Sequence, residues 1–298
     1  MIIDKTIAVA ILARDCEKSL TNNISKIEHL RTYFKASLVV IVENDSIDQT
    51  KNILKEWEKN AKHVVVLSED YHTVTFPQKT KECPFPGTSM YRMEKMCFFR
   101  NKYMDYLKNA DIEYDYLMVV DIDVDSIEVQ SIIDTLINAP SDWTALFANG
   151  VRYLKLLKKI KIGYYDTYPL LLCNENAGDN AIIEKTYKEM AENAVKIIEV
   201  LKKEKFVSCV SAFGGIGIYK YQYIKNEHYH TIYNTRSSVF EVLCDHVSLN
   251  YALYKKNIGT NYIASEMIVY YEQVKSIKLF LSLIIPLGIK KLLKKYPA

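Results

Sequence analysis

The sequence predicts an α/β fold built on a mostly parallel central sheet with helices on its flanks. Short apolar runs rich in β-branched residues alternate with segments of helical periodicity, and such repeats are typical of parallel strands joined by crossover helices. The 298 residues are 49% hydrophobic, which provides a sizeable core for one large domain or two small ones. The net charge of +3 is too small to indicate a nucleic-acid-binding protein.

The first third of the chain supplies three expected strands and two expected helices. The strands are short apolar runs typical of buried parallel strands, at residues 6–13, 37–42 and 63–67. The first helix is expected at 19–34, where Leu20, Ile24 and Ile27 share one face. The second is expected around Trp57, with Ser46 or Asp48 as its cap.

A long irregular segment follows at residues 69–90, and its four residues Pro77, Pro84, Pro86 and Gly87 predict a surface loop. Helical periodicity then returns. The remaining expected helices lie at 91–109, 127–137, 182–203 and 238–254, and the remaining strands at 116–120, 143–148, 206–211 and 262–271, with one more after the glycine-rich turn at 213–217.

The chemical signal is strongest at the end of the apolar run 116–120, which leads directly into Asp121, Asp123 and Asp125. Ligands of open α/β sheets bind beyond the carboxyl ends of the strands, and residues two apart point to one side of an extended segment. Paired carboxylates suit Mn²⁺ or Mg²⁺, which would neutralise a leaving diphosphate. A solvated acidic turn is the alternative, and Asp125 could replace Asp121 as the partner of Asp123.

Short motifs follow one another in a fixed order up to about Tyr271. They are Ala13-Arg14-Asp15-Cys16, Glu43-Asn44-Asp45-Ser46-Ile47-Asp48-Gln49-Thr50, Arg92, Arg100-Asn101, Val119-Val120-Asp121-Ile122-Asp123, Tyr165-Asp166, Phe213-Gly214-Gly215 and Cys244-Asp245-His246. In this order they resemble the GT-A glycosyltransferases, and in particular the fungal capsular α-1,3-mannosyltransferase family. The resemblance implies one GT-A domain at 1–273, with a nucleotide-binding half at 1–125 and an acceptor-binding half at 126–273.

The resemblance also implies that Arg14, Glu43, Arg92, Arg100 and Asp121 bind the nucleotide-sugar donor. A carboxylate at Glu43 would accept hydrogen bonds from the ribose, although an acidic residue near a helix start is also favoured by the helix dipole. Arg92 and Arg100 are eight residues apart, about two helical turns, and guanidinium groups suit a diphosphate. An exposed helical face is the alternative for both arginines.

Residues of the second half complete the implied site. His246 is the expected third metal ligand beside Asp121 and Asp123, although single histidines are more often structural. Asp245 is the expected base or oxocarbenium stabiliser, and Asp166 is a second catalytic candidate because the neighbouring tyrosines suit a sugar. Each aspartate also has a non-catalytic interpretation. Asp245 could lie on a helix surface, and Asp166 could belong to an ordinary tyrosine-rich loop.

The segment after residue 273 differs from the rest. Its apolar part at 279–289 is too short to span a bilayer and contains Pro286 and Gly288. Lysines follow at 290, 291, 294 and 295. This combination favours an amphipathic tail, residues 274–298, lying in a membrane interface; a helix packed on the core is the alternative.

The cellular context is expected to be cytoplasmic, with the protein peripheral on the inner face of a membrane. Six scattered cysteines favour free thiols in a reducing compartment. The N-terminal apolar run is followed at once by Arg14 and Asp15, which does not match a signal peptide.

The function implied is transfer of a sugar from GDP-mannose or a UDP-sugar to a saccharide or lipid-linked acceptor in surface polysaccharide synthesis, with Mn²⁺ or Mg²⁺ as cofactor. One alternative is a phosphatase of the haloacid dehalogenase type, which also places Asp-x-Asp after an apolar strand. A calcium-binding EF-hand is disfavoured because Ile132 stands where that loop needs a glutamate. A catalytically inactive relative that binds a nucleotide-sugar is the last alternative.

Overall fold

The computed structural model describes residues 2–110, 113–155, 159–173, 183–237 and 239–273. The predicted amphipathic tail at 274–298 therefore lies outside the described residues. Among the helices of the described residues, none is both long and apolar enough to cross a membrane.

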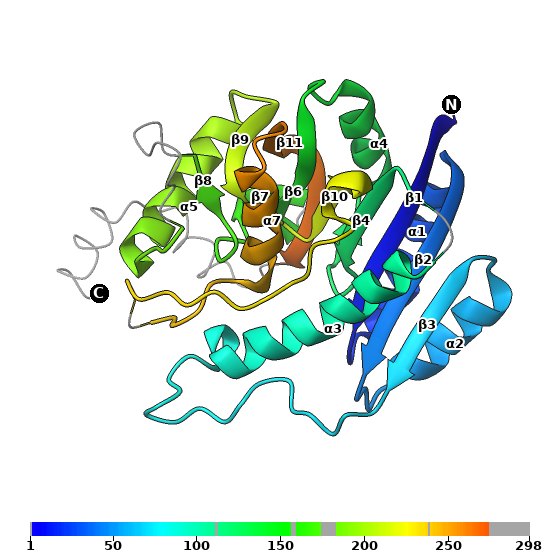
Figure 1. Cartoon of the computed structure of the whole chain (residues 1–298), viewed down its shortest axis with the longest axis horizontal. Helices are drawn as coiled ribbons and strands as arrows, with labels where there is room; N and C mark the ends of the chain where they lie inside the picture. The colour runs from blue at the N-terminus through cyan, green and yellow to red at the C-terminus, as the bar shows by residue number, and fades with distance from the viewer. Residues whose placement is uncertain (1, 111–112, 156–158, 174–182, 238, 274–298) are drawn as a thin grey trace.

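The strands nearest the N-terminus form the parallel part of one sheet (Figure 1). In sheet order they are β3 (Val64–Glu69), β2 (Phe34–Asn44), β1 (Ile3–Ala13) and β4 (Tyr116–Asp121). Helices in the connections are α1 (Glu17–Arg31), α2 (Thr50–Asn60) and α3 (Met90–Lys108), the last preceded by the short turn η1 (Pro86–Thr88). The predicted α/β class is confirmed. β1 and β2 are longer than the apolar runs from which they were predicted, because their backbone pairing continues past those runs.

The other part of the sheet mixes strand directions. β10 (Ile216–Lys220) runs antiparallel between β4 and β6 (Trp143–Lys155), and β6 is parallel to β11 (Thr260–Gln273). The edge is formed by β9 (Phe206–Ser211) and β8 (Leu171–Leu172), while β7 (Lys159–Tyr164) pairs with β6 and β5 (Ser126–Ile127) pairs with β11. Because β10 lies between β4 and β6, both predicted halves share one continuous sheet.

Four more helices complete the described fold: α4 (Val129–Asn138), α5 (Tyr187–Leu201), α6 (Tyr221–Ile224) and α7 (Asp245–Lys255). Two of them, α5 and α7, begin five or more residues later than the periodicity predicts. α5 begins after a capping box in which Thr186 and Glu189 satisfy each other's backbone N–H groups. α7 begins only at Asp245, after an irregular segment held by Asn234, whose side chain bonds to the backbone of Lys185 and Phe240.

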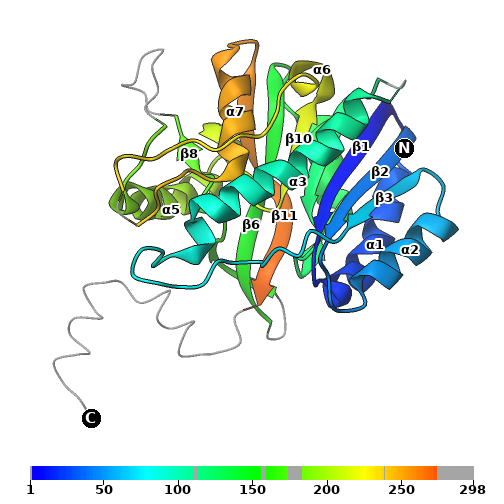
Figure 2. The same ribbon diagram turned by 60° about the horizontal axis from the view of Figure 1, so that its bottom comes forward.

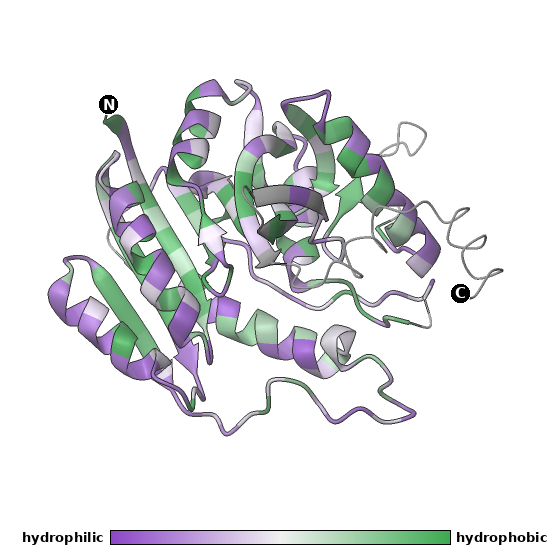
Figure 3. Cartoon of the chain, turned by 180° about the vertical axis from the view of Figure 1, so that it is seen from behind, coloured by the Kyte–Doolittle hydropathy of each residue, from purple (hydrophilic) through white to green (hydrophobic). Residues whose placement is uncertain are grey.

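Helices cover both faces of the sheet. One core contains α1, α2 and α4 packed on one face, and the other contains α3, α5, α6 and α7 on the opposite face. β1 is buried on both sides. Its residues Ile7 and Val9 belong to the first core, and Ala8 and Ala10 belong to the second. Figure 2 shows α3 crossing in front of the sheet, and Figure 3 shows hydrophobic strands beneath helices with largely hydrophilic outer sides.

The carboxyl ends of β1, β2 and β4 meet at one edge of the sheet. Ala13 pairs with Glu43 and Leu12 pairs with Asp121. The loops that follow these three strands therefore converge, and they frame the cavity described next.

Candidate active site

A cavity of about 420 Å³ opens at this edge of the sheet. It gathers residues from β1, α3, β4, the loop after β7 and the start of α7. Eight of the nine residues predicted from the sequence line it: Arg14, Arg92, Arg100, Asp121, Asp123, Asp166, Asp245 and His246. The fold therefore brings together side chains that are separated by more than two hundred residues in the sequence.

Asp121 ends β4 and is held from three directions. Its backbone N–H donates to the Gly215 carbonyl at 2.9 Å, and the Tyr271 hydroxyl donates to its Oδ2 atom at 2.9 Å. The Arg100 guanidinium lies 3.6 Å from its Oδ1 atom. Burial, together with the nearby charges of Asp123 and Asp166, raises the pKa of Asp121 to about 7 against the opposing effect of Arg100.

Asp123 is exposed at the mouth of the cavity. It also lines a neighbouring hollow of about 590 Å³ together with Asp15, Asp48 and Asp125. Asp123 is thus the carboxylate of the pair that is open to solvent, and Asp121 is the one held by the protein.

The carboxylate pair fits a divalent cation that is shared with a substrate. Among the described residues, no three His, Cys, Asp or Glu side chains form a ready metal-ligand set. Mg²⁺ is commonly bound through only one or two carboxylates plus substrate phosphates, and the repulsion between Asp121 and Asp123 favours such a cation. Asp121 and Asp123 would therefore hold the metal, with the remaining positions filled by the ligand and water.

His246 does not join these carboxylates in a preformed set. Its ring stacks on Phe213 with centroids 3.6 Å apart and meets the edge of Tyr229. The side chain is buried, its Nδ1 atom has no hydrogen-bond partner, and burial lowers its pKa to about 3. A neutral imidazole with a free ring nitrogen remains at the cavity wall.

Arg100 and Asp245 form an ion pair beneath the cavity. The Arg100 Nε group donates to Asp245 Oδ2, and the Cys244 thiol lies 3.2 Å from Asp245 Oδ1. Burial opposes the charge of Asp245, but Arg100 and the other partners hold its pKa well below the usual range. The Arg100 guanidinium also lies over the rings of Phe213 and Tyr229. Arg100 is therefore enclosed by protein groups.

Asp166 has the opposite electrostatic character. It follows β7, and its Oδ2 atom accepts the Gly214 backbone N–H at 3.0 Å. Burial raises its pKa to about 7 despite this hydrogen bond. Gly214 has φ +64°, and a Cβ atom there would lie 2.0 Å from the Ala148 carbonyl oxygen, so this close approach requires glycine. The turn thus aims its N–H group at Asp166.

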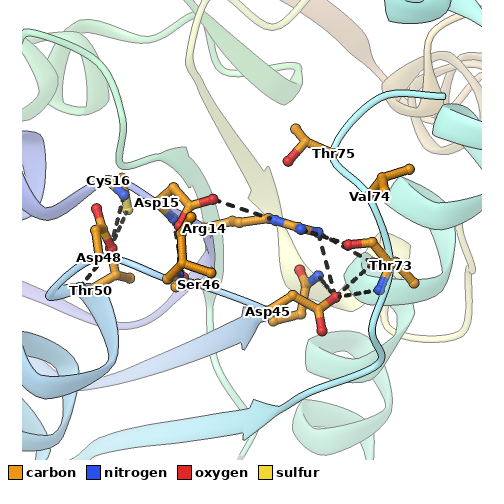
Figure 4. Close-up of polar contacts among 12 residues, drawn as sticks. Arg14, Asp15, Cys16, Asp45, Ser46, Asp48, Thr50, Thr73, Val74 and Thr75 are labelled. Carbon is orange, nitrogen blue, oxygen red and sulfur yellow. Dashed lines mark hydrogen bonds and ion pairs between the residues drawn. The ribbon is translucent and has the colours of Figure 1, made fainter. Parts of the chain in front are cut away.

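Three cations, Arg14, Arg92 and Lys95, form a basic part of the cavity wall. Arg14 extends from the end of β1 to the side chain and carbonyl of Thr73, and Asp45 points to the same threonine (Figure 4). Arg92 lies 5.2 Å from the Phe76 ring centroid. Lys95 donates to the Val74 and Thr75 carbonyls.

The charge on this wall is incompletely balanced. Within the described part of the chain, no carboxylate lies at ion-pair distance from Arg92 or Lys95, whereas Arg14 is 3.5 Å from Asp45. Burial, followed by repulsion from Arg14 and Arg92, lowers the pKa of Lys95 to about 8. The cavity therefore has an acidic wall and a basic wall, a combination suited to a phosphate ligand that carries a metal ion.

Residues 6–248 match the model of the family described as cryptococcal mannosyltransferase 1. This match includes every predicted site residue from Arg14 to His246. The chain belongs to this glycosyltransferase family. The resemblance inferred from the ordered motifs is confirmed, while β4 is a strand where an EF-hand needs a helix.

Three solved structures to which this mannosyltransferase-family chain is similar have low sequence identity to it. S. aureus TarS 1–349 shares 14% identity at a TM-score of 0.45, covering 96% of this chain and 68% of that one. The mannosyltransferase PcManGT from Pyrobaculum calidifontis, in complex with GDP-Man and Mn²⁺, shares 9% identity at a TM-score of 0.46, covering 92% and 59%. GalNAc-T7 shares 10% identity at 0.46, covering 90% and 44%. The chain thus spans less than two thirds of the second and third of these structures, and no curated protein matches it.

Glu43 is the one predicted site residue that does not line the cavity. Its side chain is 0% exposed. It accepts the Ser46 backbone N–H at 2.9 Å and the Ser68 hydroxyl. The carboxylate therefore stabilises the turn after β2, and its oxygens are occupied by the protein.

The cavity also contains residues that the sequence motifs did not single out. Lys95 lies three residues after Arg92, so helical spacing could have identified it as a neighbour. Tyr271 lies 150 residues from the aspartate to which it donates. No local pattern signals that contact, because it depends on the pairing of β11 within the sheet.

Proposed function

We propose that the protein transfers a sugar from a nucleoside diphosphate sugar to a saccharide or lipid-linked acceptor. GDP-mannose and UDP-sugars are the candidate donors. The observation that carries the proposal is the meeting of acidic and basic walls in one cavity beyond the carboxyl ends of β1 and β4. Family membership supports the transferase class.

The donor diphosphate is proposed to lie between the two walls. Asp121 and Asp123 would hold Mn²⁺ or Mg²⁺, which would offset the charge of the diphosphate as it leaves. Arg14, Arg92 and Lys95 would donate to the phosphate oxygens from the basic wall. Residues 1–125 supply all five of these groups, and this supports the proposed division into a nucleotide-binding half and an acceptor-binding half at 126–273.

Proton transfer is best assigned to Asp166. A base works best when its pKa lies near the operating pH, and burial brings the pKa of Asp166 to about 7. Asp245 is a weaker base because Arg100 keeps it ionised and occupies one of its oxygens. Its proposed contribution is to hold Arg100 beside Asp121. The proposed contribution of His246 is a contact to the donor or the cation through its unbonded ring nitrogen.

The proposed setting is assembly of a surface polysaccharide at the cytoplasmic face of a membrane. The basis is the apolar and basic composition of residues 274–298. Lysines that follow the apolar stretch would attract anionic lipid and keep the cavity near a lipid-linked acceptor.

Thermal shift with a panel of nucleotide-sugars, with and without Mn²⁺, tests the donor assignment. One donor class should raise the melting temperature, and Mn²⁺ should increase that rise because a cation held by Asp121 and Asp123 would offset the charge of the bound diphosphate. Binding without turnover would identify an inactive relative. If no nucleotide-sugar stabilises the protein under either condition, the donor proposal is wrong.

A further inference from the structure

Tyr271 connects the last described strand to the acidic wall of the cavity. It lies near the end of β11, lines the cavity, and donates its hydroxyl hydrogen to Asp121 Oδ2 at 2.9 Å. We propose that Tyr271 is a positioning residue that fixes the Asp121 carboxylate for a divalent cation. This inference rests on the proposed function, because it assumes that Asp121 and Asp123 hold that cation.

The ring of Tyr271 is fixed by its neighbours on the cavity wall. It stacks on Tyr165 with centroids 3.7 Å apart and an interplanar angle of 16°. A Cβ atom on Gly215 would lie 3.3 Å from two ring carbons of Tyr271, so the glycine leaves just enough space for the ring. With the ring held in this way, the hydroxyl has little freedom to leave Asp121.

Gly215 also holds the backbone of the same aspartate. Its carbonyl accepts the Asp121 N–H at 2.9 Å. Its φ of +92° is a backbone conformation that favours glycine. One turn therefore anchors the Asp121 main chain and provides space for the tyrosine that anchors its side chain.

The two oxygens of Asp121 have different neighbours. Tyr271 binds Oδ2, and Arg100 approaches Oδ1 at 3.6 Å. Contacts at both oxygens set the plane of the carboxylate, and each oxygen retains a lone pair for another ligand. Hydrogen bonds that orient a metal-binding side chain typically change metal affinity by about 10–100-fold when they are removed.

Tyr270 provides a matched control. It is the adjacent residue of β11, where the pairing with β6 shifts register between Tyr270 and Glu272. Its ring packs against Tyr153 with centroids 5.1 Å apart, and it does not line the cavity. Tyr270→Phe and Tyr271→Phe remove the same atom from neighbouring positions and leave both rings in place.

The test is direct Mn²⁺ titration of the full chain in the presence of GDP or UDP, with free Mn²⁺ measured by electron paramagnetic resonance. Tyr271→Phe should weaken Mn²⁺ binding by about 10–100-fold, while Tyr270→Phe should bind like the wild type. Circular dichroism should show the same fold for all three proteins. If activity is found, the Mn²⁺ concentration for half-activation should rise for Tyr271→Phe while kcat at saturating Mn²⁺ changes much less.

Two outcomes would overturn the inference, and they can be told apart. Wild-type Mn²⁺ affinity in Tyr271→Phe would show that the hydroxyl does not position Asp121, and would leave the proposed function standing. Failure of the wild-type protein to bind Mn²⁺ with either nucleotide would remove the proposed metal site and this inference with it.

Discussion

Arg100 on α3 and Asp245 at the start of α7 form a buried ion pair between residues 145 positions apart. Both side chains are almost inaccessible, at 2% and 4% exposure. The same guanidinium lies 3.6 Å from Asp121. Two helices that cover one face of the sheet are thus joined directly below the carboxylate that ends β4.

Replacing Arg100 with Ala should destabilise the fold strongly. The change leaves Asp245 buried without its cation, and breaking a buried pair in this way typically costs about 3–5 kcal/mol. Urea denaturation measures the change in the free energy of unfolding. Lys202→Ala removes an exposed ion pair with Glu199 and should change stability very little. Equal stability of the two variants would show that the buried pair contributes nothing of this size.

Lys95 should make donor binding depend on pH. Its pKa is lowered to about 8, so the ammonium is present below that pH and is lost above it. The KM for the donor should therefore rise about tenfold between pH 7 and pH 9, the effect of losing one charge-assisted hydrogen bond. Lys95→Arg should remove this rise, since arginine stays charged.

A matched control for this prediction is Lys102→Met. Lys102 lies on the same helix, but it pairs with Glu69 outside the cavity. Its replacement should leave the pH dependence of KM intact. A rise in KM that persists in Lys95→Arg would assign the titration to another group.

Asp166→Asn should lower kcat by about 100-fold or more, as expected for loss of a general base. The pKa of Asp166 is raised to about 7, so the carboxylate is protonated below that pH and available as a base above it. The wild-type rate should therefore rise with pH through about 7, and the variant should lose this rise. The profile is measured at saturating Mn²⁺, because a bound cation keeps Asp121 ionised. Asp105→Asn, on the outside of α3, should keep the wild-type profile.

Deleting residues 274–298 should move the protein from anionic vesicles to the soluble fraction. The apolar and basic composition of this segment is the reason for the expectation. Sedimentation with vesicles containing phosphatidylserine measures the partition. Unchanged binding by the truncated chain would show that residues 274–298 do not carry membrane association.

The parts of the site that could be predicted from sequence are those with a local signature. Asp121 and Asp123 follow an unbroken apolar run, so a strand end was evident, and β4 indeed ends at Asp121. Arg92 and Arg100 lie on the expected helix. These inferences needed only the periodicity of strands and helices.

The remaining features depend on tertiary packing. Arg100 was expected to meet a diphosphate, but its pairing with Asp245 could not be seen because it requires the docking of α3 against α7. Glu43 was expected at the ribose, but the carboxylate turns inward to Ser46 and Ser68. The position of β10 between β4 and β6 likewise comes from long-range pairing, for which sequence periodicity contains no signal.

Turnover of a nucleotide-sugar by the wild type and by Asp123→Ala, with Mn²⁺ and with EDTA, tests the central claim most directly. Asp123 is exposed, so its replacement should leave the melting temperature unchanged. The account predicts turnover that requires the metal and falls about 100-fold or more in Asp123→Ala, while Asp134→Ala on the outer side of α4 keeps wild-type turnover. Undiminished turnover in Asp123→Ala, or wild-type turnover that EDTA does not reduce, would contradict it.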